Sequence, residues 1–158
     1  MNNQELIHKF YSSFAKGDAN EMISCYHPEI VFEDPAFGIL KGEAAKAMWK
    51  MLLSNSKNGL RIKYQDVIAN EHTGSAYWIA DYLFSQTGRP VNNHIHASFE
   101  FKDGLIYKHK DDFNLWKWSR QALGTPGLLL GWSAYFKKSL QKRTNTLLKK
   151  YMEQHNVQ

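Results

Sequence analysis

The spacing of apolar residues predicts helices in the first third of the chain. Over 2–16, apolar residues recur three and four positions apart, and Gly17 follows as a stop signal. Shorter runs of the same kind cover 18–26, which Pro28 is expected to end, and 42–55. We therefore predict three N-terminal helices.

Apolar and polar residues alternate through the middle of the chain, which is the pattern of strands with one buried face. The alternating runs cover 60–70, 76–87, 91–102 and 105–115, and a shorter run covers 29–33. Glycine and proline mark the connections between the long runs. Helices followed by an antiparallel meander predict an α+β fold, a cone-shaped curved antiparallel sheet wrapped around the N-terminal helices with one open mouth.

The connection between the last two runs decides which side chains face the interior, because a shift of one residue turns a strand over. A two-residue loop, Asp103-Gly104, gives two equally mixed faces. A three-residue loop that adds Lys102 pairs Phe101 with Leu105 and gives one mainly apolar and one mainly polar face. We choose the three-residue loop, because a one-sided antiparallel sheet has such faces.

The apolar face defined in this way carries a carboxylate. It comprises Ile95, Ala97, Phe99, Phe101, Leu105, Tyr107, His109, Asp111 and Phe113. A buried carboxylate costs free energy unless it is partnered or put to use. Asp111 and His109 are therefore candidates for an acid–base pair, in which Asp111 takes a carbon-bound proton and His109 donates or orients. The alternative is a structural Asp111 that accepts hydrogen bonds from Tyr11 or a backbone amide.

Composition narrows the classes of function. The 158 residues suit one domain with a real core, and aromatic residues make up 14% of them, enough to line a pocket. The single cysteine, Cys25, excludes a disulfide framework and a cysteine-based zinc site. No phosphate loop, flavin or nicotinamide signature occurs, so we expect no cofactor. Because neither a secretory leader nor an apolar run of about 20 residues is found, we expect a cytoplasmic protein.

Positive charge is concentrated at the C-terminal end. The net charge is +5, but residues 115–158 hold eight Lys or Arg and one acid, so the remainder carries −2. Glycine and proline are expected to interrupt regular structure between 122 and 131, and a basic helix is expected over 133–155. We expect this helix to pack on the body or on a partner subunit, with no nucleic-acid partner. Contact with a membrane surface is the alternative.

Three short motifs occur in a characteristic order. They are Lys16-Gly17-Asp18, then Val31-Phe32-Glu33-Asp34-Pro35 before a glycine, then Asp103-Gly104-Leu105-Ile106. With the order of elements, they resemble the nuclear transport factor 2-like superfamily, which includes ketosteroid isomerases, limonene epoxide hydrolases and SnoaL-type polyketide cyclases. The resemblance implies a domain over 1–115 and a basic helical extension over 116–158. Function does not follow from this fold alone.

The resemblance to ketosteroid isomerases is partial. Their proton-shuttling aspartate lies in a Glu-Asp-Pro turn, which implies a base at Asp34. The alternative is that Asp34 fixes its own turn by accepting backbone hydrogen bonds. The positions of their two oxyanion donors fall on Phe10, with Tyr11 one step away, and on Ala97. Because neither Phe10 nor Ala97 has a donor group, we do not expect steroid isomerisation.

The resemblance to limonene epoxide hydrolases is also incomplete. The aspartate of their last strand corresponds to Asp111. Asp81 lies one residue from the position of their second acid, but Ile79 stands where their arginine would be. Asp81 is alternatively a salt-bridged strand residue. SnoaL-type cyclases require only one aspartate that acts as acid or base in a similar pocket. Of the three groups, they are the one that Asp111 with His109 fits best.

The resemblance implies a pocket inside the cone. We expect it to be lined by Phe10, Tyr11, Phe14, Trp49, Asp81, Ala97, Phe99, Tyr107 and Phe113, of which the aromatic residues would also suit an ordinary core. His94 and His96 share the outer face, where we expect a homodimer interface and not a metal site, because no third ligand is evident. The hypothesis is a cofactor-free isomerase, cyclase, hydratase or hydrolase acting on a small, mostly apolar molecule. The alternative is a non-catalytic ligand-binding or dimeric interaction domain.

Overall fold

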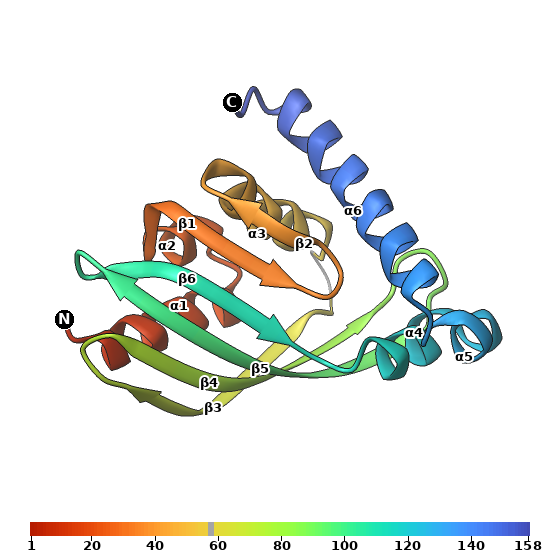
Figure 1. Ribbon diagram of the computed structural model, residues 1–158, viewed down its shortest axis with the longest axis horizontal. Helices are drawn as coiled ribbons and strands as arrows, with labels where there is room; N and C mark the ends of the chain where they lie inside the picture. Colours follow the sequence, from red (N-terminus) through yellow and green to blue (C-terminus); the bar gives the residue numbers. More distant parts are fainter. Residues whose placement is uncertain (57–58) are drawn as a thin grey trace.

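The computed structural model describes residues 1–56 and 59–158 and combines helices with one curved sheet (Figure 1). The helices are α1 (Asn3–Lys16), α2 (Ala19–Ile23), α3 (Glu43–Asn55), α4 (Leu115–Leu123), α5 (Thr125–Leu130) and α6 (Ala134–Gln154). The strands are β1 (Tyr26–Asp34), β2 (Gly38–Lys41), β3 (Arg61–Ala69), β4 (Thr73–Leu83), β5 (Pro90–Lys102) and β6 (Leu105–Asp112). The predicted α+β architecture is confirmed.

The strands form one six-stranded sheet in the order β2-β1-β6-β5-β4-β3. The long strands β3 to β6 make the predicted antiparallel meander, whereas β1 pairs with β6 in parallel, so the sheet is not wholly antiparallel. The sheet is curved and does not close on itself, and α1, α2 and α3 lie on one side of it (Figure 1). The core between sheet and helices is almost entirely apolar and aromatic.

The first strand is longer than predicted, and the second helix is shorter. Helix α2 ends at Ile23, and Tyr26 already belongs to β1 instead of closing the helix. Pro28 lies inside the strand, where the ladder with β6 is irregular between Tyr26 and Val31. A proline cannot donate a ladder hydrogen bond, and it is tolerated at such an irregularity. Pro28 therefore marks a break in pairing and not the end of a helix.

The connection between β5 and β6 has two residues, not three. Lys102 pairs with Leu105, and the intervening Asp103 and Gly104 both have positive φ, as a tight hairpin turn requires. The predicted faces are still correct for most of the hairpin, because one extra residue on β6 shifts the register between Phe101 and Glu100. Beyond this bulge, Phe99 lies opposite His109 and Ala97 opposite Asp111.

The segment after β6 is helical where we expected irregular structure. Gly124, with a φ of 72°, separates α4 from α5, and a proline stands in the first turn of α5.

 Gly127 lies inside α5 and does not break it, whereas Gly131 is the C-cap at which α5 ends. A Cβ on Gly127 would lie 2.0 Å from the Ser119 carbonyl oxygen, so glycine is what lets α5 pack directly on α4.

The expected C-terminal helix is present as α6, and it packs on the body of the same chain. It runs beside α3 (Figure 1), and Leu148 is buried in the main core. Three of its side chains bond to successive carbonyls of the turn between β1 and β2. Gln141 donates to Pro35 O at 3.2 Å, Thr144 to Ala36 O at 2.7 Å and Asn145 to Phe37 O at 2.8 Å.

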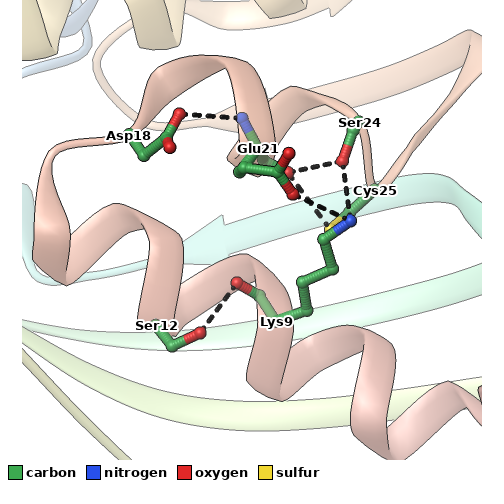
Figure 2. Close-up of polar contacts among 6 residues, drawn as sticks. All are labelled: Lys9, Ser12, Asp18, Glu21, Ser24 and Cys25. Carbon is green, nitrogen blue, oxygen red and sulfur yellow. Dashed lines mark hydrogen bonds and ion pairs between the residues drawn. The ribbon is translucent and has the colours of Figure 1, made fainter.

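Helix α2 is fastened to α1 by a small polar cluster (Figure 2). Lys9 Nζ lies 3.1 Å from Glu21 Oε2 and donates to Ser24 Oγ at 3.0 Å. Asp18 caps α2 by accepting a hydrogen bond from the Glu21 amide. Cys25 is buried beside this cluster, and burial raises the pKa of its thiol to about 11. The cluster therefore fixes the position at which β1 begins.

Candidate functional site

A cavity of about 650 Å³ lies between the sheet, α3 and α6. Its inner wall is mainly aromatic and aliphatic, with Phe14, Trp49, Trp78 and Ile95 among the lining residues. Two carboxyl groups, Asp34 and Asp111, also line it. The wall supplied by α6 consists of Phe136, Ser139, Leu140, Arg143, Thr144, Leu147, Lys150, Tyr151 and Gln154. An apolar hollow with a few polar groups is the usual form of a small-molecule site.

Asp111 is buried in this wall and is held by two N–H donors. Its side chain is 3% exposed. The Oδ1 atom accepts hydrogen bonds from His109 Nε2 at 2.9 Å and from Trp78 Nε1 at 3.2 Å. No hydrogen bond to Oδ2 is found within 1–56 and 59–158. One oxygen is thus fixed by the protein, and the other is available to a molecule in the cavity.

The hydrogen bonds continue behind Asp111 to the core. His109 Nδ1 lies 2.6 Å from Tyr26 Oη, and Trp49 Nε1 donates to the same hydroxyl at 2.8 Å. Because a carboxylate only accepts, His109 Nε2–H donates to Asp111, and Nδ1 accepts a hydrogen bond from the Tyr26 hydroxyl, whose oxygen accepts from Trp49. Burial raises the pKa of Tyr26 well above its usual value, so the hydroxyl keeps its proton. The chain of bonds therefore orients His109 as a donor to Asp111.

Asp34 lies on the turn that α6 holds in place. Its Oδ1 accepts hydrogen bonds from the amides of Ala36, at 2.9 Å, and Phe37, at 2.6 Å, so the predicted turn chemistry is confirmed. Burial is the main cause that raises the pKa of this carboxyl from 3.8 to about 7, and the charge of Asp111 raises it further. Near neutral pH, Asp34 is therefore populated in both its protonated and ionised forms.

Tyr82 adds a hydroxyl group to the same cavity. Trp118 Nε1 donates to its oxygen at 2.8 Å, so the hydroxyl proton is not used in that bond. Burial raises the pKa of Tyr82, the charge of Asp34 adds to the effect, and both residues line the same cavity. Tyr82 can therefore donate a hydrogen bond to a molecule beside Asp34.

Most of the residues predicted from the sequence lie either on the cavity wall or directly behind it. Asp34, Asp111, Phe14, Trp49 and Phe113 line the cavity. A second set is buried behind the cavity wall and comprises His109, Phe10, Tyr11, Ala97 and Phe99. The expected burial of Asp111 and His109 is confirmed.

The structural alternative was that Asp111 accepts a hydrogen bond from Tyr11 or from a backbone amide. The hydrogen bond from Tyr11 is not found. Its buried hydroxyl finds no hydrogen-bond partner in the described part of the chain. The donors to Asp111 are His109 and Trp78 instead. Burial raises the pKa of Tyr11 well above its usual value.

Two predicted lining residues lie elsewhere. Tyr107 is the extra residue of the β6 bulge, and its ring packs against His27 and beneath Lys102, away from the cavity. Asp81 alternates with Ala80 and Tyr82 along β4, so that these two face the cavity while Asp81 bonds to Asn92. Neither residue can contact a molecule in the cavity without a change of register.

Sequence reasoning missed three groups of functional interest. Trp78 and Tyr82 share the inward face of β4, and the alternation of Ala76, Trp78, Ala80 and Tyr82 was a usable signal. Tyr26 was missed because it was assigned to a helix. The wall formed by α6 had no signal at all, since nothing in the sequence brings this helix to the cavity.

The outer face of the sheet holds the two predicted surface histidines. His94 and His96 are both exposed, and His94 bonds to Tyr77 and Asn92. In the described ranges, no group of three or more His, Cys, Asp or Glu side chains is arranged to hold a metal ion. Across those same residues, no helix combines the length and hydropathy needed to cross a membrane.

Comparison with known proteins places most of this chain in a family. A family model described as a SnoaL-like domain matches residues 7–109. No curated protein was found to match the sequence. Solved structures similar to this chain include a proposed polyketide cyclase from Xanthomonas campestris, with 19% identity and a TM-score of 0.60 over 74% of this chain and 93% of that one. Another is TerC co-crystallised with polyporic acid, with 18% identity and a TM-score of 0.60 over 70% and 89%.

A proposed isomerase from Bacillus subtilis is similar to the same degree, with 20% identity and a TM-score of 0.59 over 76% of this chain and 91% of that one. At these identities the structural similarity shows the fold alone. The family model spans more than half of the sequence, from within α1 through α3 and β1 to His109 in β6. The chain therefore belongs to the SnoaL-like domain family of the nuclear transport factor 2-like superfamily.

Proposed function

We propose that this protein catalyses proton transfer on a small, mostly apolar molecule without a cofactor, in a reaction of the isomerase, cyclase or hydratase type. The observation that carries the proposal is the pair of carboxyl groups, Asp34 and Asp111, that face one apolar cavity from different environments. Two carboxyl groups beside one bound molecule can serve as the general acid and the general base of a proton transfer.

In the proposed mechanism, Asp111 is the base. Its Oδ2 takes a proton from a carbon atom next to a substrate carbonyl, while the two bonds to Oδ1 from His109 and Trp78 hold the carboxylate in position. His109 is a positioning residue, because it lies behind Asp111 and does not line the cavity.

Asp34 is the complementary acid. Since the pKa of Asp34 is raised to about 7, its protonated form can give a proton to the carbonyl oxygen as Asp111 removes one from carbon. The products of this step are an enol, protonated Asp111 and ionised Asp34, and the reverse transfers at another carbon complete an isomerisation. Tyr82 can stabilise the developing oxyanion by a hydrogen bond. Asp34 and Tyr82 would thus replace the donors that are missing at Phe10 and Ala97.

The cavity favours a ligand with an apolar body and an acidic group. The aromatic inner wall suits the body, and Arg143 and Lys150 of α6 line the same cavity. Neither cation forms an ion pair within the described residues. The similar protein TerC was co-crystallised with an acid, polyporic acid, which agrees with this ligand class.

The test is exchange of carbon-bound protons of 2-tetralone, an apolar ketone, into D2O, followed by NMR. The wild-type protein should accelerate exchange above the buffer rate, and Asp111→Asn should lower this acceleration by about 100-fold or more. Asp112→Asn is the matched control, because Asp112 is adjacent but exposed on the outer face. The Asp112→Asn variant should exchange the carbon-bound protons of the ketone at the wild-type rate.

The same experiment distinguishes the alternative function. A ketone that binds, as measured by a thermal shift, without faster exchange would identify a non-catalytic ligand-binding domain. Unfolding of Asp111→Asn at the assay temperature would assign Asp111 a structural role.

A further inference from the structure

The end of the molecule formed by α5 and the start of α6 exposes large apolar side chains. Leu128, Leu129, Leu130, Trp132 and Tyr135, which we call the apolar tip, are between 48% and 79% exposed. All five fall within eight consecutive residues. Figure 1 shows α5 at one end of the molecule, beyond the strands and away from α1 and α2. Single exposed apolar residues are ordinary, but a contiguous group indicates a binding surface.

The packing of α5 explains why these side chains point outward. Gly127 and Gly131 are buried against Ser119 of α4, so the small residues of α5 form its inner side. The leucines between them are left on the other side. Trp132 donates its indole N–H to the Leu129 carbonyl at 2.9 Å, which holds its ring within the tip.

Basic residues surround the apolar tip. Lys137 and Lys138 are exposed on the first turn of α6, and Lys117 and Arg120 lie on α4, where with Arg89 they line a small surface hollow. No acidic residue occurs between Phe113 and Met152. The tip is therefore apolar at its centre, and its surroundings carry positive charge that no acid in this segment offsets.

We propose that the apolar tip docks on an anionic membrane surface. Trp and Tyr favour the membrane–water interface, leucines enter the acyl boundary, and Lys and Arg are attracted to anionic lipid headgroups. Charge complementarity favours this partner over a second copy of the chain, because two copies would bring like charges together around the tip. The proposal is independent of the reaction proposed for the cavity.

Vesicle flotation tests the proposal on the full chain. The protein should float with vesicles of phosphatidylcholine and phosphatidylglycerol in equal amounts and not with phosphatidylcholine alone. Raising NaCl from about 0.1 M to about 1 M should weaken binding, because the Debye length falls from about 10 Å to about 3 Å. The double variant Trp132→Ser, Tyr135→Ser should reduce the bound fraction at least tenfold.

Matched variants separate docking from general effects. Ile68→Ser removes an equally exposed apolar side chain from β3 and should bind vesicles as the wild type does. Lys137→Glu with Lys138→Glu should lose binding, whereas Lys63→Glu, which changes an exposed lysine of β3, should not. Equal flotation of the wild type and the tip variant would overturn the proposal. So would a tip-dependent dimer in light scattering with no vesicle binding.

Discussion

At the scale of single residues, two buried tyrosines differ in how their hydroxyl groups are satisfied. Tyr26 bonds to both His109 and Trp49, whereas Tyr11 has no partner in the described part of the chain. A buried polar group without a partner costs about 1–3 kcal/mol, and a satisfied one does not. The two hydroxyls should therefore respond to removal in opposite directions.

Replacing Tyr11 by Phe should raise the free energy of unfolding by about 1 kcal/mol, because the unpaired hydroxyl is lost and the ring is kept. Tyr26→Phe is the control and should lower it by about 1–3 kcal/mol, because His109 Nδ1 and Trp49 Nε1 lose their partner. Urea denaturation measures both. A loss of stability in Tyr11→Phe would show that its hydroxyl has a partner in solution.

Asp34 should make stability depend on pH. Its pKa rises from 3.8 to about 7 on folding. At a pH between these two values, the native state therefore keeps a proton that the unfolded state has released. Stability is then highest below the unfolded pKa and falls as the pH rises toward 7. Asp34→Asn keeps the acceptor oxygen for the two backbone amides but cannot ionise.

The Tm of Asp34→Asn should therefore exceed that of the wild type at pH 8 and approach it at pH 4. Calorimetry at intermediate pH values measures the difference, which should grow between pH 4 and 7, the interval set by the two pKa values. Glu33→Gln, a half-buried neighbour, serves as the control. A constant difference across this range would mean that Asp34 titrates normally.

At the scale of elements, α5 depends on a close approach. Alanine normally stabilises a helix relative to glycine by about 1 kcal/mol. In α5, a Cβ on Gly127 would lie 2.0 Å from the carbonyl oxygen of Ser119, so the two helices would have to separate.

Gly127→Ala should thus lower the free energy of unfolding by about 1–3 kcal/mol, despite its better helix propensity. Thr125→Ala, at an exposed position of the same helix, should change it little. Chemical denaturation gives both values. A stabilised Gly127→Ala would show that α5 does not pack on α4 in this way.

Local periodicity predicts elements well where one face packs on the core. Helices α1 and α3 and the strands β3 to β6 follow from the spacing of their apolar residues. The same reasoning fails where one residue changes a register, as Tyr107 does in β6, because either loop length satisfies the hairpin's turn chemistry. It also fails at Gly127, since a glycine needed for close packing and one that ends a helix look alike in a sequence.

At the scale of the whole molecule, the fold could be predicted but the cavity only in part. The order of elements indicated the curved sheet, and the alternation along β5 and β6 indicated Asp111. The parallel pairing of β1 with β6 joins strands far apart in the chain, which no local pattern encodes. The α6 wall of the cavity arises in the same way, from a segment beyond the matched family region.

The three bonds from Gln141, Thr144 and Asn145 to the turn beside Asp34 have a consequence for the acidity of that residue. If the C-terminal helix lifted from the turn, water would reach the carboxyl group and lower its pKa toward the ordinary value. The pKa of Asp34, measured by an NMR titration, would then show whether α6 is packed on the turn. A segment outside the family's common domain would in this way govern the strength of an acid within it.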